Sequence, residues 1–177
     1  MRGAREEVRV VSLASVSVAL AAVLSFLGIG MPMGGKLSLE MLPLIALSLI
    51  NLRAGILASI SYGFLKVLLE SVPIVHPVQM VLDYPLAFGV LAVGGLFRKP
   101  ILGATVAVLL RYLIHVISGV IFFSAYAKGD PITYSIIYNA TYMLPSGLLT
   151  IVLIEPVMRS LRAKEKLRGR TSKLRNT

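Results

Sequence analysis

The sequence predicts an all-α integral membrane protein with six transmembrane helices, and three observations support this fold class. Of the 177 residues, 56% are apolar and 15% are charged, whereas soluble domains carry about 25% charged residues. The mean hydropathy is +0.84. The apolar residues form long runs, and a spanning helix needs roughly 20 of them, so the length suits about six spans with short loops.

The six apolar segments are separated by Gly/Pro-rich or charged connections. The first segment is long and has no clear signal-peptidase site, so we expect it to remain as a helix. Glycines and prolines interrupt the pattern in IGMPMGGK (29–36) and VPIVHP (72–77). We expect Pro85 to kink the fourth helix or to mark its true start. The predicted helices are about Val8 to Gly28, Ser38 to Leu52, Ala54 to Ser71, Val78 to Phe97, Ile101 to Phe123 and Tyr134 to Met158.

The domain organisation follows from the charge distribution. Residues 1–158 form a single six-helix transmembrane domain, and residues 159–177 form a basic tail that carries most of the net charge of +10. A basic tail on a membrane protein indicates a cytoplasmic, lipid-facing segment before it indicates a nucleic-acid site. There are no cysteines, which excludes disulfides, thiolate metal sites and cysteine nucleophiles.

Lysine and arginine placement predicts the orientation. If the N-terminus is cytoplasmic, Arg53, the pair Arg98 and Lys99, and the basic tail all fall on the cytoplasmic side, and only Lys36 and Lys128 lie in outer loops. Cytoplasmic loops of membrane proteins are enriched in these residues. We therefore expect both termini in the cytoplasm.

With this orientation, the polar groups of several helices share the outer half of the membrane. Asp83 lies early in the fourth helix, His115 and Gly119 lie late in the fifth, and Tyr134 and Asn139 lie early in the sixth. An ionisable group at the centre of a span costs about 2.5–3.5 kcal/mol on insertion scales and normally faces a protein interior or a wet cavity. The sequence thus predicts a polar pocket open to the outside.

The fifth segment carries a stripe of unusual residues at a spacing of four. Arg111, His115, Gly119 and Phe123 fall along one helical face, which favours a functional lining. We expect Arg111 to pair with Asp83. The alternative is that Arg111 and His115 bond to the backbone and only stabilise the bundle.

Other candidate positions have structural alternatives. Asp83 and Tyr84 supply an anion beside an aromatic ring, yet Asp before Tyr-Pro is also a good helix N-cap. Asn139 can donate and accept, which suits a heterocycle edge, but it can equally bond between helices. Glu40 and Glu70 are interpreted as interfacial residues.

Two further patterns concern partners and catalysis. Small residues recur at Ser15 and Ala19 in the first helix, a spacing that allows close helix packing, within the bundle or against another subunit. There is no P-loop, no H-E-x-x-H, no G-x-S-x-G and no Cys/His cluster. An enzyme is therefore unsupported, and no metal site or cofactor is expected.

Three motifs in order, LDYPLAFGVLAVGGLFRKP, LLRYLIHVISGVIFFSAYA and YSIIYNATYMLP, resemble the thiamine-specific substrate-binding component (S component) of energy-coupling factor transporters. The resemblance covers roughly Asp83 to Pro145. It implies a six-helix protein of the prokaryotic plasma membrane that captures thiamine near the outer face. It also implies a transmembrane coupling subunit and two ATPases as partners, docked through Ser15 and Ala19, with ATP hydrolysis left to the ATPases.

The resemblance carries over residue by residue, with departures. Asp83 stands for a longer family acid, Arg111 for a lysine and Phe123 for a tryptophan. The chain has no Trp at all. Asp83 and the aromatic rings would hold the thiazolium cation, His115 and Asn139 would bond the heterocycle, and Arg111 would position Asp83. The implied substrate-binding residues are Asp83, Tyr84, Arg111, His115, Gly119, Phe123, Tyr134 and Asn139.

Three alternatives remain open. The same fold could bind another small vitamin or precursor, such as hydroxymethylpyrimidine. An intramembrane enzyme could use Asp83 and His115. A structural or assembly membrane protein would bind no ligand.

Overall fold

The computed structural model describes residues 2–31, 35–70, 74–127 and 129–174 and confirms the predicted all-α membrane fold. A two-stranded antiparallel hairpin, which the sequence did not predict, pairs Ile29 with Leu37 and Gly30 with Lys36. The elements in order are α1 (Arg2–Phe26), β1 (Ile29–Gly30), β2 (Lys36–Leu37), α2 (Met41–Ile50), α3 (Leu52–Glu70), α4 (Pro77–Val81), η1 (Leu82–Leu86), α5 (Ala87–Gly89), η2 (Val90–Leu96), α6 (Pro100–Phe122), η3 (Ser124–Tyr126) and α7 (Pro131–Leu174).

Within the described residues, five helical segments are long and apolar enough to cross a membrane, and α2 is a shorter sixth. A helix of ten residues, such as α2, is about 15 Å long, whereas the hydrocarbon core is about 30 Å thick. By itself, α2 is therefore too short to cross the hydrocarbon core.

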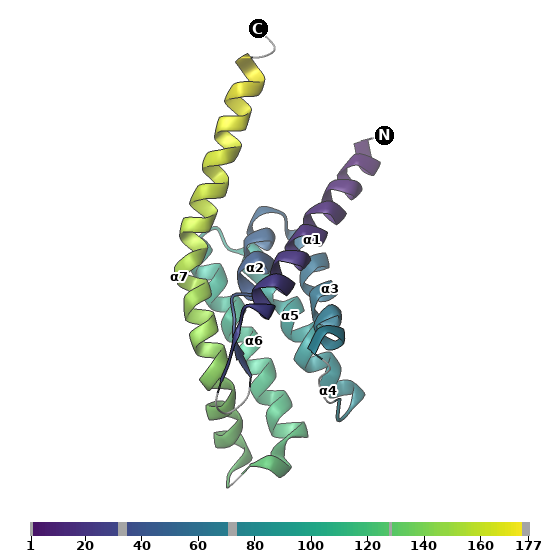
Figure 1. The fold of residues 1–177 in the computed structure, drawn as a ribbon, viewed down its shortest axis with the longest axis vertical. Helices are drawn as coiled ribbons and strands as arrows, with labels where there is room; N and C mark the ends of the chain where they lie inside the picture. Colours follow the sequence, from purple (N-terminus) through teal and green to yellow (C-terminus); the bar gives the residue numbers. More distant parts are fainter. Residues whose placement is uncertain (1, 32–34, 71–73, 128, 175–177) are drawn as a thin grey trace.

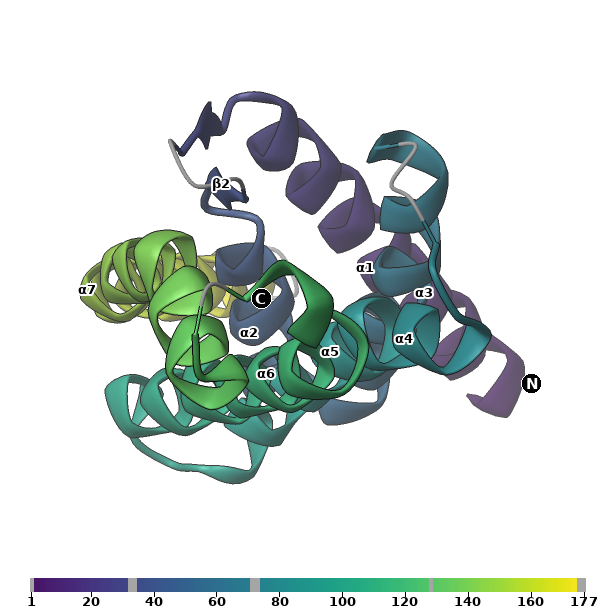
Figure 2. The same ribbon diagram turned by 90° about the horizontal axis from the view of Figure 1, so that it is seen from below.

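The two ends of the helix bundle differ in which parts of the chain they contain. Both termini lie at the same end, and the α6–α7 connection lies at the other (Figure 1). Near the termini, the Arg53 Nη2 of α3 lies 2.9 Å from the Glu7 Oε1 of α1. Viewed from the opposite end, the hairpin lies between α1 and α7, and α4 lies on the far side of the bundle (Figure 2).

The fourth apolar segment is not a regular α-helix. The His76 Nδ1 accepts a hydrogen bond from the Val78 amide at 3.1 Å and caps α4, and a wide π-turn, η1, follows at Leu82–Leu86. Pro85 lies inside this turn, where a regular α-helix would place its ring against the carbonyl four residues earlier. The predicted kink at Pro85 is thus a π-turn, a feature common at functional sites.

Small and apolar residues let the helices approach closely. Ala21, Ala54, Ala58, Ala104 and Ala107 are fully buried. Small residues at such positions allow tight helix packing in membranes, where apolar side chains gain little by leaving lipid. The large apolar side chains on the outside are therefore expected to face lipid.

The last helix extends beyond its predicted limits in both directions. It begins at Pro131, where the exposed Asp130 carboxylate accepts 2.7 Å hydrogen bonds from the Thr133 amide and hydroxyl. These hydrogen bonds lower the pKa of Asp130 because they favour the charged carboxylate. The helix then continues to Leu174, so the predicted basic tail prolongs α7 as far as this residue.

Candidate functional site

A cavity of about 940 Å³, lined by both polar and apolar side chains, lies toward the end of the bundle where α6 and α7 are connected. Its walls come from α1, the β2 segment, α2, α3, α4, η1, α5, α6 and α7. All eight residues predicted to bind substrate line it, from segments far apart in the sequence: Asp83, Tyr84, Arg111, His115, Gly119, Phe123, Tyr134 and Asn139.

The i, i+4 periodicity of α6 explains why its polar residues face inward. Leu109, Leu113, Ile117 and Ile121 form an exposed apolar stripe along this helix. The stripe containing Arg111, His115, Gly119 and Phe123 lies on another face and lines the cavity. One helix thus presents apolar side chains to lipid and its costly polar ones to a protein cavity.

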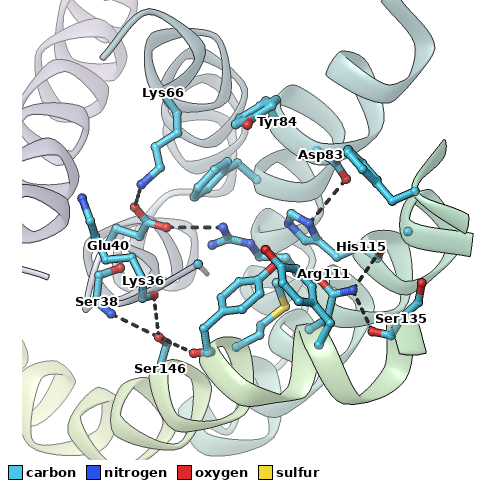
Figure 3. Close-up of a pocket in the computed structure, with 18 of the residues that line it drawn as sticks. Lys36, Ser38, Glu40, Lys66, Asp83, Tyr84, Arg111, His115, Ser135 and Ser146 are labelled. Carbon is cyan, nitrogen blue, oxygen red and sulfur yellow. Dashed lines mark hydrogen bonds and ion pairs between the residues drawn. The ribbon is translucent and has the colours of Figure 1, made fainter. Parts of the chain in front are cut away.

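Asp83 lies in a small polar cluster between η1 and α6. Its Oδ2 accepts a 2.7 Å hydrogen bond from the Gln79 Nε2, and its Oδ1 lies 3.4 Å from the His115 Nδ1 (Figure 3). The other ring nitrogen of His115, Nε2, is buried and has no hydrogen-bond partner among the described residues. Because Nδ1 faces a carboxylate, a neutral His115 would place its proton there and leave Nε2 as an acceptor.

The predicted pair between Arg111 and Asp83 is wrong. The Arg111 Nη2 lies 3.3 Å from the Glu40 Oε1 instead. The guanidinium also lies over the Phe88 ring, 3.8 Å from its centroid. These two contacts direct Arg111 toward α2 and α5, whereas the partners of Asp83 are Gln79 and His115.

Glu40 forms the centre of a buried network at the inner wall of the cavity. The Lys66 ammonium donates to the Glu40 Oε2 and, at 2.6 Å, to the Ser25 hydroxyl. The Tyr62 hydroxyl also donates to this Oε2, at 2.8 Å. Glu40, Lys66 and Arg111 are each only 6% exposed. The interpretation of Glu40 as interfacial is therefore wrong; the side chain of Glu70 lies outside the described residues.

Aromatic rings and an amide line the α7 side of the cavity. Tyr134 stacks on Tyr138, and Tyr138 meets Tyr142 edge to face, both at 5.9 Å between centroids. The Asn139 Nδ2 donates to the carbonyls of Ser135 (2.9 Å) and His115 (3.4 Å), and its Oδ1 accepts from the Tyr142 hydroxyl at 2.7 Å. The structure thus supports a bond from Asn139 to the neighbouring helix α6 as well as a place in the cavity wall.

Sequence reasoning missed several residues of the cavity, and one signal was available for them. Lys66 lies inside the third apolar segment, and an ionisable residue within a span indicates a functional position by default. Tyr138 and Tyr142 belong to the polar and aromatic run 134–145, which the sequence marks as unusual for a spanning helix. No pattern pointed to Gln79, or to Ser146, whose hydroxyl accepts from the distant Ser38 amide. The lining residues absent from the predicted substrate-binding set include Lys66, Gln79, Tyr138, Tyr142 and Ser146.

The predicted docking positions on α1 lie outside the cavity. Ser15 and Ala19 are exposed, while Ala14 and Ala21 are buried against the bundle. The Ser15 hydroxyl donates to the Val11 carbonyl of its own helix at 2.9 Å. The small residues of α1 therefore divide between a face packed in the bundle and a face available to another helix.

Comparisons with known proteins agree with this architecture. A family model described as thiamine transporter protein matches residues 11–166. The thiamine transporter ThiT of Bacillus subtilis (strain 168) is 31% identical over 176 residues, which cover 87% of this chain and 92% of that protein. ThiT of Lacticaseibacillus paracasei is 31% identical over 137 residues, covering 63% and 68% of the two chains.

A solved structure of a thiamine transporter has the same fold. ThiT from Listeria monocytogenes superposes with a TM-score of 0.75 at 25% sequence identity, covering 88% of this chain and 96% of that one. The family match spans most of the sequence, including every candidate cavity residue and both positions on α1. This chain, a multi-pass protein of the prokaryotic cell membrane, belongs to the thiamine transporter family.

Proposed function

We propose that this chain is the membrane subunit that captures thiamine for uptake, and that the cavity described above is its binding site. The observation that carries the proposal is the convergence of an anion, an imidazole and several aromatic rings on one cavity. Thiamine combines a cationic thiazolium with an aminopyrimidine, so it needs both a partner for positive charge and groups that bond ring nitrogens.

Asp83 and the aromatic wall would hold the thiazolium. The described partners of Asp83 are the Gln79 amide and the His115 ring. When His115 is neutral, neither partner carries a positive charge that would compensate the carboxylate. Tyr84, Phe123, Tyr134 and Tyr138 all line the same space. A desolvated cation over an aromatic face gains about 0.5–2 kcal/mol per contact, so several tyrosines can replace the missing tryptophan.

His115 and Arg111 would bond the polar groups of the ligand. The His115 Nε2 and the Arg111 Nε are buried atoms that have no hydrogen-bond partner among the described residues. Buried polar atoms of this kind are costly unless a ligand or water satisfies them. The first offers an acceptor for the exocyclic amine, and the second offers a donor. Asn139 would act mainly by holding Tyr142 and α6 in place.

Uptake would require partners that supply energy. The chain would associate with a transmembrane coupling subunit and two ATPases of the energy-coupling factor type. The exposed face of α1 that contains Ser15 and Ala19 is the proposed contact with the coupling subunit, because small residues let a second helix approach closely.

Calorimetric titration of purified protein with thiamine tests the proposed function. We expect tight binding by the unaltered protein. Asp83→Asn should weaken it by at least about 30-fold, since removing one partner of a buried charge pair costs roughly 2–5 kcal/mol. Glu155→Gln is the matched control, because Glu155 pairs with the exposed Arg159 on α7. Unchanged thiamine affinity in Asp83→Asn would contradict the proposed role of Asp83.

Two further measurements separate the alternatives. If hydroxymethylpyrimidine displaces thiamine at lower concentration than thiamine displaces it, the transported ligand is the precursor. Chemical conversion of thiamine by the purified protein would identify an enzyme. Well-folded protein that binds neither compound would reject the proposed function.

A further inference from the structure

The cavity contains several positively charged side chains, which a binding site for the thiamine cation does not by itself explain. The described lining includes three cationic side chains, Lys36, Lys66 and Arg111, but only two carboxylates, Glu40 and Asp83. Two of these cations, Lys66 and Arg111, are buried, although the proposed ligand is itself a cation. Some device must keep this positive charge from repelling the ligand.

The arrangement around Glu40 supplies such a device. Its two oxygens divide the cations between them: Oε1 faces the Arg111 Nη2 at 3.3 Å, and Oε2 receives the Lys66 ammonium. Tyr62 adds a third donor to the same carboxylate. Figure 3 shows Glu40 between Lys66 and Arg111 on one side of the cavity, with Asp83 and His115 on the other.

The two cations are also held away from Asp83 by their other contacts. The Lys66 ammonium bonds to the Ser25 hydroxyl of α1. The Arg111 guanidinium lies over Phe88, which is 1% exposed and itself packed edge to face on Tyr62 at 4.7 Å. The cavity is therefore polarised, with its cations gathered at the Glu40 end and its less compensated carboxylate at the Asp83 end.

Building on the proposed function, we propose that Glu40 is a positioning and specificity-determining residue: it offsets part of the positive charge of Lys66 and Arg111 and retains both side chains, and so allows the cavity to accept a positively charged ligand. Without the carboxylate, two buried cations would lose their shared partner in a site of low dielectric constant, where like charges repel strongly. Glu40 would thus raise the affinity for a cationic ligand through its effect on Lys66 and Arg111, without contacting the thiazolium.

The test compares two ligands of the same shape and different charge. The first is thiamine, and the second is a neutral analogue in which thiophene replaces the thiazolium ring. Glu40→Gln should weaken thiamine binding by on the order of 30-fold and binding of the neutral analogue by less than about threefold. A purely structural role for Glu40 would weaken both ligands alike, which would overturn the proposal.

Lys66→Met provides a second variant with an effect of opposite sign. It removes one cation while Glu40 keeps Arg111 and Tyr62 as partners. The ratio of thiamine affinity to analogue affinity should therefore rise, by on the order of tenfold. An unchanged or lower ratio in Lys66→Met contradicts the proposal even if Glu40→Gln does not fold.

Matched controls complete the experiment. Glu40→Asp keeps the charge and should retain the ratio of the two affinities within about threefold. Glu7→Gln removes an exposed carboxylate that pairs with Arg53 near the termini, and it should leave both affinities unchanged. If the unaltered protein binds neither ligand, the proposed function fails; if it binds thiamine and the ratio does not respond to Glu40 and Lys66, this inference alone fails.

Discussion

At Gly119 the wall of the cavity has no side chain, and α7 occupies the space that a side chain would need. A β-carbon at this position would lie 2.5 Å from the Ser135 Oγ and 3.5 Å from the Asn139 Nδ2. Both neighbours belong to the α7 face that lines the cavity. The missing side chain therefore sets how closely α6 and α7 approach at the site.

We predict that Gly119→Ala weakens thiamine binding by about tenfold and lowers stability, because overpacking of this kind costs about 1–3 kcal/mol. Calorimetry and thermal unfolding in detergent would measure the two effects. Adding Ser135→Ala removes the hydroxyl nearest to the new methyl group, so the double variant should recover part of both losses. Equal affinities for Gly119→Ala and the unaltered protein would contradict this account of the α6–α7 contact.

Individual site residues were predictable where an unusual residue type stood inside an apolar run. Arg111 and His115 attracted attention in this way, and both line the cavity. The partner of Arg111 was not predictable, because Glu40 lies 71 residues away and only the folded bundle brings them together. Asp83 seemed the natural partner on charge alone, yet Gln79, one helical turn earlier, and His115 hold it instead.

Among the elements, η1 depends on an unusually close contact with α3. A β-carbon on Gly63 would lie 2.5 Å from the Pro85 Cα and 2.7 Å from the Tyr84 carbonyl oxygen. These are backbone atoms, which cannot rotate away as a side chain can. The absence of a side chain at Gly63 therefore lets the π-turn that contains Asp83 and Tyr84 rest directly on α3.

We predict that Gly63→Ala displaces η1 and reduces both stability and thiamine affinity. The loss of stability should be about 1–3 kcal/mol, seen as a lower midpoint of thermal unfolding in detergent. Gly3→Ala is the matched control, because nothing lies within 4 Å of the corresponding position on α1. A Gly63→Ala protein as stable as the Gly3→Ala protein would show that η1 can yield without cost.

The approximate positions of the helices were predictable from hydropathy, but their exact ends and their local geometry were not. The predicted second helix, about Ser38 to Leu52, is shorter in the structure, at Met41–Ile50, because Ser38 bonds through its amide to the Ser146 hydroxyl instead of starting a helix. Hydropathy also could not distinguish a π-turn from a kink at Pro85. Both features depend on contacts with other helices, which a local pattern does not contain.

For the molecule as a whole, the positions of the termini bear on how it sits in the membrane. Both lie at one end of the bundle, and the α6–α7 connection lies at the other (Figure 1). Phe123, Tyr126 and Tyr134, which flank or form this connection, line the cavity. The distribution of lysine and arginine predicts that the end with the termini is cytoplasmic. A cavity at the opposite end is suited to capture a ligand from outside.

This orientation can be tested by cysteine labelling, because the natural chain contains no cysteine. We predict that Ser124→Cys in η3 reacts with a membrane-impermeant maleimide in intact cells, whereas Ser160→Cys in α7 reacts only after the membrane is opened. Both positions are exposed in the structure, so burial does not explain a difference between them. The reverse labelling pattern would show that the termini face outward.

The length of α7 has a practical consequence for imaging. One helix runs from the aromatic wall of the cavity to Leu174, and its far part projects beyond the other helices (Figure 1). A rigid scaffold protein fused in helical register after Lys166 would be held at a fixed angle to the bundle. Such a fiducial would add mass and asymmetry to a 19.1 kDa particle and make it tractable for electron cryomicroscopy without altering the loops around the cavity.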